Sequence, residues 1–201
     1  MAATPKQPLP YQSVLENRPR YTRAIGMITV ELSNLDVILG ELLAAILAIN
    51  VKFGRAIYLA PYASSARLSI LGNVSEAIFK EKSPALLKIN NIIGRARGSH
   101  TRRDELIHAA WGLVKKRVHK RNLPLKDTRP STPVELAHLT LLIRDIRVLI
   151  TETFSLAQEI CTSGVLDALH GRFPPQGPDA TPQPNTPPIN PLLTQIRPRP
   201  A

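Results

Sequence analysis

The sequence predicts an all-α fold, an antiparallel four-helix-type bundle with a long amphipathic first helix. Two observations favour helices: apolar residues recur at alternating spacings of three and four in two long segments, and helix-capping sequences precede other segments. A third observation is that no segment alternates apolar and polar residues well enough to indicate a sheet. The chain of 201 residues is long enough for one domain with a substantial core.

The first helix is predicted over residues 25–49. Its apolar positions follow a 3.5-residue repeat, which places one seam along a helix of about 40 Å. Such a seam is typical of a four-helix bundle, or of a bundle that also dimerises. The seam residues are Ile25, Ile28, Leu32, Leu35, Leu39, Leu42, Ile46 and Ile49.

Two further helices are expected between residues 61 and 98. The first follows Pro61 and carries Ile70, Leu71, Val74 and Ile78 on one face. The next opens at Ser83-Pro84, because serine is a good N-cap and proline fits the first helical position. Gly94 and Gly98 weaken the end of this helix.

Capping boxes predict the starts of two more helices. One is Thr101-Arg102-Arg103-Asp104, followed by an apolar stripe that runs to Leu113 and Val114. The other is Thr132-Pro133-Val134-Glu135, which opens the last long helix; that helix ends at Gly164. Between them, residues 114–129 are compatible with a short basic hairpin or with a loop.

Proline density sets the expected domain boundaries. We expect a Pro-rich extension over residues 1–20, the helical domain over 21–172, and a Pro-rich tail over 173–201, which holds ten of the nineteen prolines. No signal peptide is visible at the start, and acidic residues interrupt the most apolar run, so a soluble cytoplasmic protein without membrane contact is predicted. The single cysteine, Cys161, fits a reducing compartment.

The net charge of +11 is concentrated in one segment. Residues 88–129 carry twelve Lys or Arg residues and three acids, a net charge of +9. A local basic field of this kind favours a polyanion partner, RNA or DNA before lipid. The alternative is an ordinary solvated face.

The basic segment contains the sequence RDELIH at residues 103–108. At about 100° per residue, Asp104 and His108 share the polar side of the predicted helix, where the carboxylate would orient the imidazole. Arg103 and His108 are about 140° apart on an ideal helix. They converge only if Arg103 bends around the helix end, or if two protomers each contribute one of them.

This stretch resembles the motif of the HEPN superfamily of helical nucleases and nucleotide-binding proteins, in which an arginine and a polar residue are followed a few residues later by a histidine. The wider context of residues 21–165 is similar: a long first helix, the motif, then Trp111, a loop and a capped last helix. Two departures are Ala109, where the family often has glycine, and the lack of the tyrosine that active ribonucleases of the family often carry just after the histidine; the nearest aromatic residue here is Trp111.

The resemblance implies a dimeric endoribonuclease that cleaves RNA without a metal, of the toxin or phage-defence kind, with an antitoxin or nucleotidyltransferase as a further partner. Arg103 would hold the scissile phosphate, His108 would act as general acid or base, and Asp104 would orient the imidazole. No metal or cofactor is expected, since no cluster has metal-ligand spacing. The residues expected to hold the RNA backbone are Arg102, Lys115, Lys116, Arg117, Lys120 and Arg121.

Several alternatives stay open at this point. His108 could be an ordinary surface or interface histidine, Asp104 only a capping residue, and Trp111 core or dimer packing. Asp36 in the first helix stands where related sequences often have an acid, and is a weaker candidate to face the cleft. The competing functions are a non-catalytic helical dimer that binds nucleic acid or a protein, and an accessory subunit of a nucleotidyltransferase or similar partner.

Overall fold

A computed structural model describes residues 15, 17–114, 117–122 and 132–162. All of them belong to one compact unit, Met1–Leu166. The described residues form five helices and one small sheet. The helices are α2 (Pro19–Leu47), α3 (Val51–Leu59), α4 (Ser64–Ile78), α5 (Pro84–Ile107) and α6 (Leu136–Thr162), and the strands are β1 (Ala109–Val114), β2 (Arg117–Asn122) and β3 (Thr132–Pro133). The mainly helical fold predicted from the sequence is confirmed.

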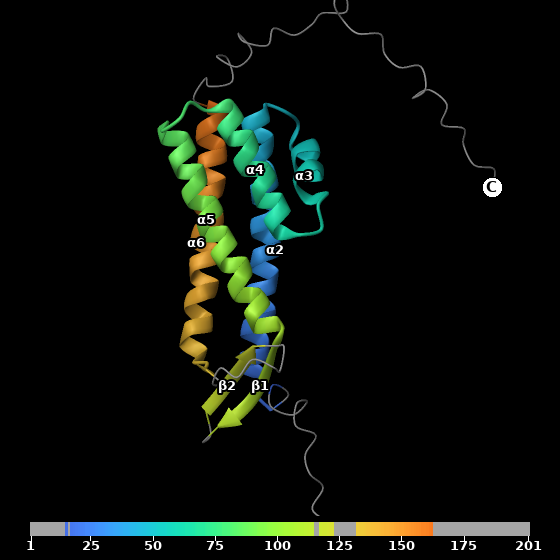
Figure 1. Ribbon diagram of the computed structural model, residues 1–201, viewed down its shortest axis with the longest axis vertical. Coiled ribbons are helices and arrows are strands. Elements are labelled where there is room, and N and C mark those ends of the chain that lie inside the picture. The colour runs from blue at the N-terminus through green and yellow to red at the C-terminus, as the bar shows by residue number, and fades with distance from the viewer. Residues whose placement is uncertain (1–14, 16, 115–116, 123–131, 163–201) are drawn as a thin grey trace, which may run out of the picture. The chain divides into compact units, whose positions relative to one another are not determined.

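The bundle is built around α2, which packs against α3, α4, α5 and α6 (Figure 1). Helices α2 and α6 run in the same direction: the Tyr21 hydroxyl near the start of α2 donates to the carbonyl of Val134, just before α6. Helix α5 runs opposite to α6, because the ion pair between Lys88 and Glu159 joins the start of α5 to the end of α6. The bundle is therefore antiparallel only in part, because α2, α4 and α6 run in the same direction and α5 runs opposite to them (Figure 1).

The apolar seam predicted for the first helix lies in the core. Its central residues, from Ile28 to Ile46, are buried. The helix ends at Leu47, earlier than predicted, because Ala48 takes a left-handed conformation with φ 54°. Ile49 consequently lies in the turn between α2 and α3.

The predicted helix start at Thr101 is wrong. Helix α5 runs without a break from its N-cap, Ser83, to Ile107, through both Gly94 and Gly98. Thr101 lies inside it, and its hydroxyl donates to the carbonyl of Arg97, one turn earlier. The RDELIH sequence is thus the C-terminal end of a long helix, with His108 as its C-cap, rather than the first turn of a new helix.

The residues after the motif form an antiparallel hairpin, not a helix. Leu113 and Val114 belong to β1, which pairs with β2 over residues 109–114 and 117–122. Of the two alternatives for residues 114–129, the structure shows a hairpin, which begins five residues earlier, at Ala109; residues 115–116 and 123–129 lie outside the described part of the chain. A third strand replaces the capping box predicted at Thr132: Thr132 and Pro133 pair with β2, and α6 starts only at Leu136.

In the described part of the chain, no single helix is both long and apolar enough to cross a membrane. Helices α2 and α3 reach that length and composition only when taken together, and they are bent by 120° at the break between them. The predicted tail, residues 173–201, lies outside the described residues.

Candidate functional site

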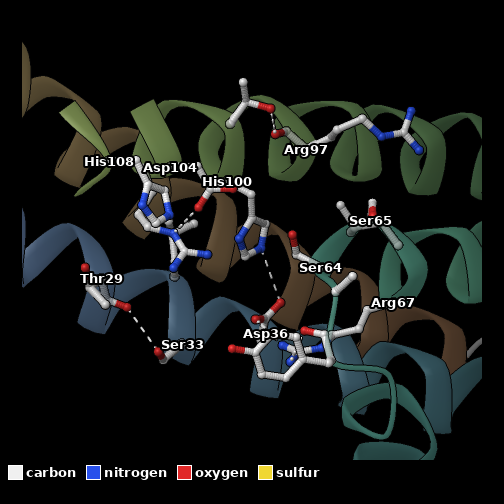
Figure 2. A pocket seen from close by; sticks show the side chains of 16 residues that line it. Thr29, Ser33, Asp36, Ser64, Ser65, Arg67, Arg97, His100, Asp104 and His108 are labelled. Carbon is white, nitrogen blue, oxygen red and sulfur yellow. Dashed lines mark hydrogen bonds and ion pairs between the residues drawn. The ribbon is translucent and has the colours of Figure 1, made fainter. Parts of the chain in front are cut away.

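A polar cavity of about 620 Å³ opens between α2, the start of α4 and the second half of α5 (Figure 2). It contains all three residues predicted to be catalytic, and Asp36 as well. The lining residues are Thr29, Leu32, Ser33, Asp36, Tyr62, Ala63, Ser64, Ser65, Arg67, Leu68, Arg97, His100, Thr101, Arg103, Asp104 and His108.

Arg103 and His108 line this cavity within a single chain. The helix ends at Ile107, and His108 takes the non-helical cap conformation φ −92°, ψ 8°. The ideal-helix angle of 140° therefore does not apply to the pair. Arg103 lies just before the last turn of α5 rather than in the first turn of a helix, so the helix dipole does not disfavour its positive charge there.

Asp104 is paired with Arg103 rather than with the imidazole of His108. Its Oδ1 lies 3.0 Å from Nε of Arg103, close enough for an ion pair but poorly aligned for a hydrogen bond. Its backbone carbonyl accepts the N–H of His108 at 2.9 Å, which fixes the backbone of the cap. Asp104 thus orients the arginine through its side chain and the histidine through its main chain.

Asp36 and Arg67 form a largely buried ion pair at the wall of the cavity. Nη1 of Arg67 donates to Oδ2 of Asp36 at 2.8 Å, and the two side chains are 19% and 11% exposed. The other guanidinium nitrogens donate to the carbonyls of Pro61 and Tyr62, at 2.8 and 3.2 Å. Arg67 therefore ties α2 to the segment that connects α3 with α4.

His100 approaches Asp36 from the opposite side. Its Nε2 lies 3.3 Å from Oδ1 of Asp36, and the residue is only 4% exposed (Figure 2). Among the described residues, neither ring nitrogen of His100 has a hydrogen-bond partner of good geometry. A buried imidazole of this kind costs free energy unless another group satisfies it.

Tyr58 on α3 completes the polar cluster behind the cavity wall. The residue is fully buried, and its hydroxyl donates a long bond of 3.5 Å to Oδ1 of Asp36. Burial raises the pKa of the Tyr58 phenol far above its ordinary value, and the negative charge of Asp36 raises it further. The phenol is therefore neutral and can serve Asp36 as a donor.

A close helix contact places α3 and the segment that follows it. A Cβ atom added at Gly54 would lie 2.4 Å from the Cβ of Ala44 on α2. Only glycine permits this approach, which seats Tyr58 beside α2 and leads the chain into the cavity wall at Tyr62 and Ala63.

The residues predicted to hold the RNA backbone are distributed over other surfaces. Arg102 and Lys120 line a separate groove next to Glu105, which pairs with Lys120 at 2.8 Å. Arg117 is exposed at the start of β2. Arg121 belongs to β2, whereas Lys115 and Lys116 lie outside the described residues.

Trp111 belongs to the core. It is 7% exposed, and its indole N–H donates to the carbonyl of Leu106 at 3.0 Å, which fastens β1 to the end of α5. This bears out the packing alternative. Within the described part of the chain, no group of three or more His, Cys, Asp or Glu side chains is arranged to hold a metal ion.

Four residues of the site were missed in the sequence: Tyr58, Arg67, Arg97 and His100. For Arg97 and His100, the sequence did contain a pattern that could have identified them. In a helix continuous to residue 107, Arg97, His100, Asp104 and His108 follow one another at helical spacings of three and four. This face was not recognised in the sequence, because the capping box at Thr101 predicted a helix boundary in the middle of it.

No protein-family model matches this sequence, and neither a curated protein nor a solved structure shows significant similarity to it. The function is therefore argued from the cavity itself.

Proposed function

We propose that this chain is a metal-independent endoribonuclease of the HEPN kind that acts as a dimer. The observation that carries the proposal is the presence of Arg103, Asp104 and His108 on one cavity. Arg103, a cation that binds phosphate, and His108, a group that transfers protons, are then available to the same phosphodiester of the substrate.

Arg103 holds the scissile phosphate in this mechanism. Its guanidinium is charged at every working pH and presents a planar fork to two phosphate oxygens. Asp104, 3.0 Å from Nε, restrains the side chain without occupying the rest of the fork. Arg103 is partly exposed at 30%, so RNA can reach the group.

His108 carries out the proton transfers in this mechanism. The ribose 2′-oxygen attacks the phosphorus while a neutral imidazole accepts its proton. The bond from phosphorus to the 5′-oxygen breaks, and a protonated imidazole supplies the proton of the leaving hydroxyl. The products are a 2′,3′-cyclic phosphate and a free 5′-hydroxyl. Two imidazoles share these steps most simply when two protomers join their cavities.

Exposed apolar side chains beside the motif support such a dimer. Val30, next to the cavity residue Thr29, is 52% exposed, and Ile107, next to His108, is 42% exposed. Burying them against a second copy would remove apolar surface from water and bring the two cavities together. The basic side chains of Arg102, Arg117 and Lys120, on surfaces outside the cavity, would then attract the RNA backbone with little sequence choice.

The test is cleavage of a mixed single-stranded RNA pool in EDTA by the wild type, Arg103→Ala and His108→Ala. Each variant should lower the cleavage rate by about 100-fold or more, because it removes the phosphate grip or the proton transfer. The cleaved ends should be a cyclic phosphate and a 5′-hydroxyl.

The matched control is Arg95→Ala, which removes the same residue type as Arg103→Ala from another surface of the same fold. Arg95 is exposed, pairs with Glu152 and lines a different groove. It should cleave like the wild type. If the wild type binds the pool but leaves it whole, the chain is a non-catalytic binding dimer and the enzyme proposal falls.

A further inference from the structure

The N-terminus of α4 opens onto the same cavity as the motif. Ser64 and Ser65, its first two residues, both line the cavity. The backbone N–H groups of Ala66 and Arg67 donate to the carbonyl of Ala63, so the preceding two N–H groups lie outside the helical pattern. Helix α4 carries no acidic residue in its first turn and no side-chain N-cap bond. This end of the helix therefore keeps its partial positive charge unopposed from within the helix.

A second observation at the same place is the buried imidazole of His100. It lines the cavity from α5, whereas Ser64 lines it from α4 (Figure 2). The ring is buried, yet among the described residues no group hydrogen-bonds to either of its nitrogens. A ligand atom in the cavity can satisfy the imidazole and recover the free energy of that buried polar group.

The charges around this end of the cavity are compatible with a bound anion. The nearest acid is Asp36, whose charge is offset by Arg67 at 2.8 Å. The exposed guanidinium of Arg97 stands at the rim and has no ion-pair partner among the residues that the structure describes.

We infer that Ser64, Ser65 and His100 form a second phosphate site, which binds the RNA phosphate next to the one held by Arg103 and His108. Along α5, His100 precedes Arg103 by three residues, about 5 Å of helix axis. This separation suits neighbouring phosphates of one strand. The inference rests on the proposed function for the identity of the ligand, and it gives the cavity a substrate of at least three nucleotides.

The test uses 2′-O-methyl oligonucleotides of mixed sequence, which cannot be cleaved by attack of the 2′-oxygen. A dinucleotide carries one phosphodiester and a trinucleotide carries two. Their affinities are measured for the wild type, Ser64→Asp and Asn73→Asp by competition with a labelled longer RNA. An aspartate in the first helical turn stabilises the helix, so lost binding in Ser64→Asp cannot be assigned to unfolding.

The wild type should bind the trinucleotide more tightly than the dinucleotide, and Ser64→Asp should abolish that gain, on the order of tenfold, by repelling the second phosphate. Asn73→Asp adds the same charge on an exposed residue of α4 outside the cavity, and it should keep the gain. An equal gain in Ser64→Asp and in the wild type overturns the second site.

Cleavage and binding separate this inference from the proposed function. If Ser64→Asp removes the gain while the wild type cleaves no RNA in EDTA, the phosphate site stands and the nuclease proposal fails. If the wild type cleaves and Ser64→Asp leaves the gain intact, the nuclease stands without the second site. Failure of the wild type to bind either oligonucleotide overturns the second site, and the cleavage assay then decides the nuclease proposal by itself.

Discussion

The carboxylate of Asp36 on α2 lies between the guanidinium of Arg67, 2.8 Å from its Oδ2, and the imidazole of the buried His100, 3.3 Å from its Oδ1. One acid from the first long helix thus fixes residues of α4 and α5, the other two helices that line the cavity. The shape of the site depends on this acid even if it never touches a substrate.

Replacing Asp36 should be far costlier than replacing an acid of a surface pair. Asp36→Ala leaves Arg67 largely buried without its partner, and should lower the free energy of unfolding by roughly 3 kcal/mol. Glu159→Ala breaks a pair that is more than half exposed on both sides, and should change it by about 0.5 kcal/mol or less. Urea unfolding followed by circular dichroism measures both. Equal losses would show that the Asp36 cluster does not hold the helices together.

Tyr58 should make the fold sensitive to alkaline pH. Burial raises its pKa above the value of about 10 in the unfolded chain, so above pH 10 only the unfolded state gains stability by ionising the phenol. The contribution of the Tyr58 phenol to the free energy of unfolding is fully present below pH 10 and is lost progressively above it. Tyr58→Phe should therefore lose less stability than the wild type between pH 10 and 11.

Absorbance at 295 nm gives an independent readout of the same phenol. Up to the onset of alkaline unfolding, the wild type and Tyr58→Phe should show the same increase, because Tyr58 stays neutral while folded. After unfolding, the wild type should exceed the variant by one tyrosinate. A difference before unfolding would mean that the phenol ionises in the native protein.

Long-range regularities in the sequence predicted the fold, whereas short local signals misplaced its boundaries. The seam of the first helix was confirmed because its residues are buried together, and the Ser83-Pro84 start was confirmed because the serine side chain caps the helix. At Thr101 they conflict. A capping box is compatible with a helix start, but burying Ile93, Ala96 and His100 requires the helix to pass through Gly94 and Gly98.

The candidate site was predictable only in part, for a physical reason. Arg103, Asp104 and His108 lie close in sequence, so a motif could join them. His100 was assigned no role because its relation to Asp36 crosses between helices and exists only in the folded chain. The hairpin could not be predicted for a similar reason. Trp111 anchors β1 through a hydrogen bond to the carbonyl of Leu106, and this contact leaves no alternating pattern of residue types in the sequence.

The continuity of α5 can be tested by two matched substitutions. Ser83→Ala removes a true N-cap, whose side chain accepts the N–H of Leu86, and should cost about 1 kcal/mol. Thr101→Ala lies on an exposed position inside the helix, where alanine has the better propensity, and should gain a few tenths of a kcal/mol. Thermal unfolding compares them directly. A loss of about 1 kcal/mol in Thr101→Ala would instead indicate a helix start at that residue.

The last prediction follows from the close contact between Gly54 and Ala44. In Gly54→Ala the new methyl group would overlap the side chain and backbone of Ala44, so α3 must move away from α2. Overpacking of this kind should cost about 2 kcal/mol. The displacement should also weaken RNA binding, because α3 leads into Tyr62 and Ala63 of the cavity wall.

Gly94→Ala is the matched control, since its Cβ would meet no atom within 4 Å and alanine favours the helix. It should stabilise the protein by about 0.5–1 kcal/mol without changing RNA affinity. Denaturant unfolding and RNA binding are measured on both variants. If Gly54→Ala proves as stable as Gly94→Ala, α3 does not pack against α2 through this glycine, and the cavity wall must be positioned by the Arg67 contacts alone.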